Sequence, residues 1–274
     1  MVFDQGGSLR ERCEIGSVRL SHGEADYDEG AVVPVDDWRP LTPREAQWLQ
    51  AKPGTPDAEL IELVHQPLPD SRVEEALAVQ ADAAGLYPFT DCWPAEFLGC
   101  VTNPGDARTT TEDPATGRRL GLHVDNWDRL PYGARGDGRR RLCLNLGPGT
   151  RYFLLGDRDI EEIYRLVHPD PEHHYPHTDD VRRYVTQGRP LQCLRIRLEP
   201  GDGYLAPTEL LPHDGSTLGG KQSSTAAFWL GRWPAGARKT RHRSNGAGPP
   251  AGKEGNGGGG TCGDTPIGGS SDGP

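Results

Sequence analysis

"RIRLEPGDGYLAPTELLPHDGST" (residues 195–217) is the stretch that best predicts how this chain folds. Its first four residues alternate polar and apolar side chains, as a strand does, and EPGDGY (199–204) then supplies the proline and glycines of a tight turn. A second strand follows the turn and runs on towards His213. The stretch therefore predicts two strands joined by a turn, with a histidine delivered by the sheet.

The rest of the C-terminal half shows the same pattern of short strands and turn residues. After Trp93 the chain contains short apolar or alternating runs bounded by Gly, Pro and Asp, namely AEFLGCVTN, GLHVDNW, RLCLNLGPG, RYFLLGD and STAAFWLGRW. Many short strands separated by turn signals predict a β-sandwich or barrel. One helix, DIEEIYRLV, is expected to interrupt the strands, with Asp157 or Asp159 as its N-cap.

The first 93 residues carry signals for helix starts instead. TPRE (42–45) offers an N-cap threonine, a proline at the first helical position and a capping-box glutamate, which predicts a helix over Pro43 to Ala51. TPDAELIELVHQ from Thr55 repeats the threonine and proline, and SRVEEALAVQADAAG from Ser71 has Ser and Glu at capping-box spacing and ends at Gly85. The predicted fold class is therefore mainly β with N-terminal helices (α+β).

Composition sets the expected domain boundaries. From about Ala235 onward the chain is dominated by Gly, Ser and Pro and has almost no large apolar residue, so it cannot bury enough surface to offset chain entropy. We expect one folded domain over residues 1–234, with a helical part (1–93) and a β core (about 94–234). A disordered tail (235–274) is expected to follow.

Charge and hydropathy exclude several function classes. The net charge of −10 argues against a nucleic-acid or anionic-membrane partner, since both need clustered positive charge. No apolar run approaches 18 residues and no leader is recognisable, so we expect a cytoplasmic protein. The cysteines show no CxxC spacing and are expected to be reduced thiols. The sequence leaves the oligomeric state open.

A candidate metal site begins in GLHVDNWDRLP (121–131). His123 and Asp125 are two residues apart, so in an extended strand they share a face. With His213 they offer two imidazoles and one carboxylate, the ligand set of non-haem Fe(II) oxygenases, which leaves three positions of an octahedral metal open. The alternative is a surface histidine beside a turn aspartate.

A second, histidine-rich stretch could also be interpreted as a metal site. HPDPEHHYPH (168–177) holds four histidines, but three prolines break it between two regular segments. A solvated loop is the better interpretation, and these histidines are left outside the predicted site.

The succession of HxD, a sheet-rich interval, PGD and a distal histidine resembles the Fe(II)/2-oxoglutarate-dependent dioxygenase superfamily, over roughly Ala95 to Trp233. The resemblance implies a double-stranded β-helix, a jelly-roll or cupin-like core. It also implies that His123, Asp125 and His213 are metal ligands and catalytic residues, with Fe(II) as cofactor and 2-oxoglutarate and O2 as co-substrates. Because Asp125 is present, the implied reaction is hydroxylation of a small molecule, such as an amino acid or specialised metabolite.

A bound 2-oxo acid needs a cation for its distal carboxylate. In the superfamily that cation comes from the strand after the distal histidine or, in some groups, from the fourth strand. Lys221 and Arg141 are ranked equal for this role, and Arg232, further from His213, comes after them. Asn145 would share a strand face with Arg141 and is counted with the co-substrate residues.

Two other functions stay open on the same residues. One is a cupin-like isomerase or lyase that uses the three ligands with Zn, Ni or Mn and no co-substrate. The other is a non-catalytic β-sandwich binding module. Iron-dependent consumption of 2-oxoglutarate separates the oxygenase from both.

Overall fold

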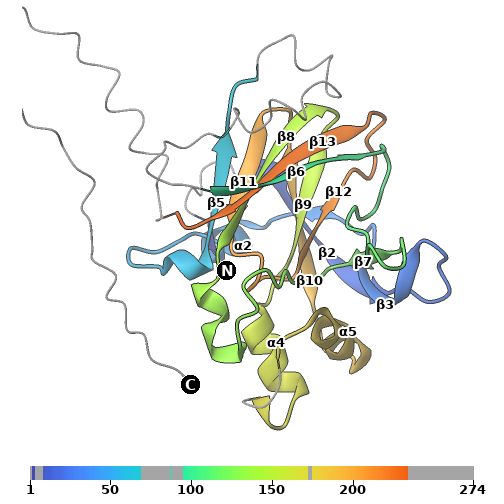
Figure 1. Ribbon diagram of the computed structural model, residues 1–274, viewed down its shortest axis with the longest axis vertical. Helices are drawn as coiled ribbons and strands as arrows, with labels where there is room; N and C mark the ends of the chain where they lie inside the picture. The colour runs from blue at the N-terminus through green and yellow to red at the C-terminus, as the bar shows by residue number, and fades with distance from the viewer. Residues whose placement is uncertain (1, 4–8, 69–86, 88–94, 172–174, 234–274) are drawn as a thin grey trace, which may run out of the picture.

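The computed structural model describes residues 2–3, 9–68, 87, 95–171 and 175–233. Within these residues the chain is mainly β, and its strands form two sheets that together make a nearly closed, barrel-like structure (Figure 1). The helix expected from Ser71 to Gly85 and the tail expected over 235–274 lie outside the described residues, so both stay predictions.

One sheet has six strands among the described residues. Their order is β1 (Val2–Phe3), β5 (Leu60–His65), β11 (Asp202–Ala206), β8 (Arg140–Pro148), β13 (Ser224–Gly231) and β6 (Ala95–Asn103). The central strands β8, β11 and β13 pair antiparallel, and only β1 and β5 are parallel.

The other described sheet has seven strands. Six of them follow the order β12 (His213–Ser216), β9 (Arg151–Gly156), β10 (Gln192–Leu198), β2 (Cys13–Leu20), β3 (Tyr27–Pro34) and β7 (Arg119–Gly121). The two-residue β4 (Arg39–Pro40) pairs with β2 beside them.

Consecutive strands of the C-terminal half pass back and forth between the two sheets. The chain runs from β8 to β9 and β10, returns to β11, crosses to β12 and ends in β13. EPGDGY therefore joins β10 to β11 as predicted, but it connects two sheets and does not close a hairpin. Gly201 in this turn has φ +88°, and a Cβ there would lie 2.7 Å from the carbonyl oxygen of Gln66, so the turn requires glycine.

The core lies between the sheets, because alternate residues of each strand point inward. Phe153 of β9 stacks on Tyr204 of β11 with ring centroids 3.5 Å apart, a direct contact from one sheet to the other. Along β8, Cys143 faces this core. Leu142 and Leu144 pack with Trp229 in a second cluster on the opposite face of the six-stranded sheet.

Short helices complete the described fold: α1 (Leu9–Arg12), α2 (Pro43–Trp48), α4 (Ile160–Val167), α5 (Thr178–Thr186) and the 3-10 turns η1 (Asp57–Glu59) and η4 (Tyr132–Asp137). Helices α4 and α5 pack together at one end of the sheets (Figure 1). Asp159 is the N-cap of α4 and accepts from the backbone N–H of Glu162, which confirms one of the two predicted caps. None of these described helices has the length and apolar character needed to cross a bilayer.

The N-terminal region departs from the helical prediction. The Thr42 capping box is present, although α2 ends at Trp48 and not at Ala51. The helix expected from Thr55 is wrong: only η1 follows it, and Leu60–His65 is strand β5. Residues before 94 also supply β2 and β3, so the N-terminal part belongs to both sheets. The physical reason is strand pairing. The backbone of β5 pairs antiparallel with that of β11, a distant partner that the local sequence does not reveal.

Candidate metal centre

Backbone pairing brings two of the predicted ligands together. His123 lies just after β7, His213 begins β12, and the two form an isolated antiparallel bridge. The N–H of His123 donates to the carbonyl of His213 at 3.1 Å, and the N–H of His213 donates back at 2.8 Å. Residues directly opposite in such a pair point to the same face. The imidazole ring centroids are accordingly 4.5 Å apart.

Asp125 joins them from a loop, because β7 ends at Gly121 and GLHVDNW is not the regular strand that was expected. The backbone N–H of Asp125 donates to the carbonyl of Thr208 at 3.1 Å. Buried Arg135 donates to the carbonyl of Asp125 at 3.2 Å and to that of Pro176 at 2.9 Å. These hydrogen bonds fix the backbone of the loop. The Asp125 carboxylate is thereby held facing the two histidines.

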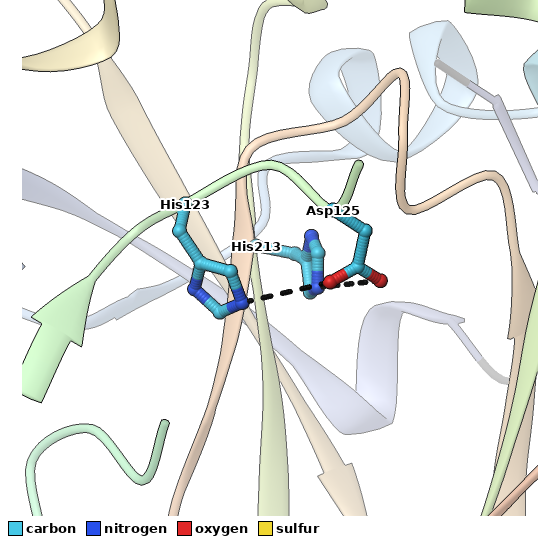
Figure 2. Close-up of side chains that lie close together, drawn as sticks. All are labelled: His123, Asp125 and His213. Atoms are coloured by element: carbon cyan, nitrogen blue, oxygen red, sulfur yellow. Dashed lines mark ion pairs between the residues drawn. The ribbon is translucent and has the colours of Figure 1, made fainter. Parts of the chain in front are cut away.

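The three side chains converge on one point (Figure 2). Asp125 Oδ1 lies 3.9 Å from Nε2 of His123, and Oδ2 lies 3.7 Å from Nε2 of His213. One ligand atom from each residue lies within 4.8 Å of the others, and all three side chains are buried. The predicted triad is therefore assembled as a group that could hold a metal ion.

Hydrogen bonding fixes which ring nitrogen of each histidine faces the centre. Nδ1 of His123 lies 2.9 Å from the carbonyl oxygen of Gly121, and Nδ1 of His213 lies 2.8 Å from that of Leu211. A carbonyl only accepts, so each Nδ1 carries the proton, and a neutral ring then has its lone pair on Nε2. Nε2 of His213 is buried and has no hydrogen-bond partner among the described residues. A metal ion fits this arrangement, because it would satisfy the unpaired nitrogen.

The electrostatics hold Asp125 and His213 in the protonation states that a metal needs. Burial alone would raise the pKa of Asp125, but the guanidinium of Arg141, with the neighbouring imidazoles, lowers it to about 2. Burial, followed by the charge of Arg141, lowers the pKa of His213 well below its ordinary value. At neutral pH the site therefore offers an ionised carboxylate and a neutral His213 imidazole.

Arg141, a predicted co-substrate residue, contacts a ligand directly. Its Nη1 lies 3.0 Å from Oδ2 of Asp125, and its Nη2 donates to the hydroxyl of Tyr204 at 3.3 Å. The guanidinium also lies 5.4 Å from the centroid of the Phe228 ring. Arg141 is therefore already engaged in balancing and orienting Asp125.

Arg151 is the basic residue that sequence reasoning missed. A cavity of about 420 Å³ is lined by both Arg141 and Arg151. Arg151 is 4% exposed, and its Nη1 has no hydrogen-bond partner among the described residues. The available signal was its place in RYFLLGD, where it shares the inward face of β9 with Phe153 and Leu155. A buried arginine with an unpaired N–H on a cavity wall is suited to bind an anion.

Glycine at position 215 leaves room for this arginine. A Cβ on Gly215 would lie 2.6 Å from Nη2 of Arg151 and 2.4 Å from Oγ1 of Thr110. Neighbouring Asp214 accepts from the backbone N–H groups of Thr110 and Thr111, both at 3.1 Å. Strand β12 thus supplies a predicted metal ligand, a space for Arg151 and an anchor for one wall of the cavity.

The other proposed co-substrate residues lie elsewhere. Asn145 does share an inward face with Cys143, but its amide donates to the carbonyls of Gly149 and Leu198 and its oxygen accepts from Gly147 and Ser224. Lys221 is exposed in a shallow hollow with Asp106, and exposed Arg232 donates to the carbonyl of Asp137 at 2.8 Å. None of these three lines the cavity beside the triad, which argues against a co-substrate role for each.

Three aromatic residues, Trp127, Tyr152 and Trp229, lie in different parts of the fold. Trp127 lines the cavity and is 49% exposed. Trp229 is buried in the cluster on the opposite face of the six-stranded sheet, and Tyr152 lies against Arg195.

Comparison with models of known protein families and with curated protein sequences gave no match for this chain.

Proposed function

We propose that this protein is a non-haem Fe(II)- and 2-oxoglutarate-dependent oxygenase that hydroxylates a small molecule. The observation that carries the proposal is the convergence of His123, Asp125 and His213, with both Nδ1 atoms bonded to carbonyls and Nε2 of His213 left unpaired. Two imidazoles and one carboxylate suit Fe(II) and leave coordination positions open.

The strand order supports a double-stranded β-helix. Successive strands from β8 to β13 pass between two facing sheets, and the two histidines lie opposite one another where β12 begins. In such a jelly roll the space between the sheets is filled by inward side chains at one end and is available to ligands at the other. The cavity lined by Arg141 and Arg151 provides that space here.

The residues around the triad divide the work of the proposed reaction. When bound, Fe(II) supplies the redox chemistry that couples oxidation of a 2-oxo acid by O2 to attack on a substrate C–H bond. His123, Asp125 and His213 hold the ion, and Arg141 orients Asp125 and balances its charge. Buried Phe153 and Leu155 keep water from the His213 side of the centre.

Arg151 is our choice for the distal carboxylate of 2-oxoglutarate. It is buried, lines the cavity and has an unpaired N–H, whereas Arg141 is engaged by Asp125 and Lys221 lies in a different hollow. A buried guanidinium can bind a carboxylate through two parallel hydrogen bonds, which fixes its orientation.

Anaerobic titration of the full chain with Fe(II) and then 2-oxoglutarate tests the proposal. The expected result is a weak visible charge-transfer band that needs both additions, followed by consumption of 2-oxoglutarate when O2 is admitted. His213→Ala should abolish the band, and His177→Ala, which changes an exposed histidine at the start of α5, serves as the matched control. Tight binding of Zn, Ni or Mn without any consumption of 2-oxoglutarate would favour the isomerase or lyase, and no metal binding at all would favour a binding module.

A further inference from the structure

The cavity beside the triad gathers large apolar side chains that are partly open to solvent. Leu98 and Val101 come from β6, Phe228 from β13 and Trp127 from the loop after Asp125. Val101 is 48% exposed and Trp127 is 49% exposed. Exposed apolar residues that line one cavity, with polar groups between them, are typical of a ligand site.

Glu112 is the one carboxylate among the described residues that line this cavity. It is exposed and makes no ion pair within the described part of the chain, and its bridge partner Arg119 lies over the ring of Tyr27. The segment before it is held in place, because the buried carboxylate of Asp214 accepts from the backbone of Thr110 and Thr111. Glu112 therefore presents an available negative charge at a fixed wall of the cavity.

Neither arginine of the cavity would bind a cation. We also do not expect them to bind a second acid in addition to the co-substrate. Arg141 is balanced by Asp125 through its Nη1, and Nη1 of Arg151 is buried with no hydrogen-bond partner among the described residues, as is Nε of Arg141. An acidic substrate would compete with the co-substrate for Arg151 and would face Glu112 elsewhere. The net charge of −10 adds a general attraction for cations.

We propose that this cavity binds a small molecule that carries an apolar group and a positively charged amine. The carboxylate of Glu112 and the indole face of Trp127 recognise the ammonium, through an ion pair and a cation–π contact. Leu98 and Phe228 contact the apolar group. That this amine is the molecule oxidised rests on the proposed function, whereas its binding does not.

Calorimetric titration of the full chain with 2-phenylethylamine and 2-phenylethanol tests the inference. These probes share a phenyl group and chain length and differ in charge. The amine should bind about threefold to thirtyfold more tightly than the alcohol, the sum expected for one exposed ion pair and one exposed cation–π contact. Glu112→Gln should reduce this preference by the share of the ion pair, leave the share of the Trp127 contact, and leave the affinity for the alcohol unchanged.

Glu59→Gln is the matched control, because Glu59 is an exposed glutamate of η1 that does not line the cavity. It should leave both affinities as they are. Equal affinities for the two probes, no binding of either, or an amine preference that Glu112→Gln leaves undiminished would overturn the inference. The titration needs neither iron nor turnover. Amine binding without consumption of 2-oxoglutarate therefore counts against the oxygenase alone, and 2-oxoglutarate turnover without an amine preference counts against this inference alone.

Discussion

Two histidine-containing regions of this protein look alike in composition and differ in what their atoms do. In the triad, Nε2 of His213 is buried and makes no hydrogen bond among the described residues, and Oδ2 of Asp125, which faces it at 3.7 Å, is paired with the guanidinium of Arg141. In the stretch 168–177, Nε2 of His168 lies 2.7 Å from Oδ1 of Asp180, and Oδ2 of Asp180 accepts from the backbone N–H of His177. The two described histidines of this stretch, His168 and His177, are thus engaged in structural hydrogen bonds.

The second region forms the start of a helix. His177 is the N-cap of α5, its Nδ1 accepts from the backbone N–H of Asp179, and Asp180 completes a capping box. His173 and His174 lie outside the described residues. The comparison teaches that a candidate metal site is recognised by buried ligand atoms that lack partners, because pairing of every polar atom is the ordinary state of a protein interior. The number of nearby histidines is a weaker criterion.

Removal of a triad histidine should have the largest effect. His213→Ala deletes a nitrogen that faces the centre, so Fe(II) affinity should fall by more than about 100-fold, beyond the range seen when only an outer partner of a ligand is lost. Anaerobic Fe(II) titration measures this loss. His168→Ala should leave Fe(II) affinity unchanged, and an equal loss in both variants would contradict the distinction between the two regions.

Loss of the cavity arginine should have the next largest effect. Arg151→Gln should weaken 2-oxoglutarate binding by about 1.5–3 kcal/mol, the value of a hydrogen bond to a charged group, with Fe(II) affinity retained. Equilibrium binding to the Fe(II)-loaded protein gives the number. Lys221→Ala is the control and should bind 2-oxoglutarate normally. If Lys221→Ala weakens binding and Arg151→Gln does not, the assignment to Arg151 is wrong.

A change at Asp180 should reverse the pattern found at the triad. Asp180→Ala removes a buried carboxylate that pairs with His168 and caps α5, which should lower the free energy of unfolding by about 1–2 kcal/mol. Urea denaturation measures the loss. Fe(II) affinity of the folded protein should stay within error of wild type, and a variant that loses iron but keeps its stability would place a metal in the second region instead.

Some features that depend on residues close together in the sequence were predicted correctly. Thr42 and Asp159 were predictable as caps because each bonds to a backbone N–H three residues away. The triad was predictable from its ligand set and spacing, although the backbone bridge between His123 and His213 replaces the regular strand that was expected.

Predictions failed where a distant partner decides the structure. Leu60–His65 follows a helix-start signal at Thr55 and Pro56, but pairing with β11 makes it a strand. Arg151 was missed because its position on the cavity wall depends on residues far along the chain, among them Gly215, which leaves space for it. Neither partner is visible in the local sequence.

The smallest effect expected is at His177, where the side chain serves as a helix cap. Threonine also caps helices, as Thr42 does in α2, so His177→Thr should keep the stability of wild type. His177→Ala should cost about 0.5–1 kcal/mol, because the backbone N–H of Asp179 loses its acceptor. Thermal unfolding of the two variants side by side gives the difference. The same exchange at the triad, His213→Thr, should abolish iron binding, since a hydroxyl there lacks the reach and the nitrogen lone pair of the imidazole. If His177→Thr is as unstable as His177→Ala, the imidazole of His177 has a role that capping does not explain, and the contrast between the two regions is weaker than the hydrogen bonds indicate.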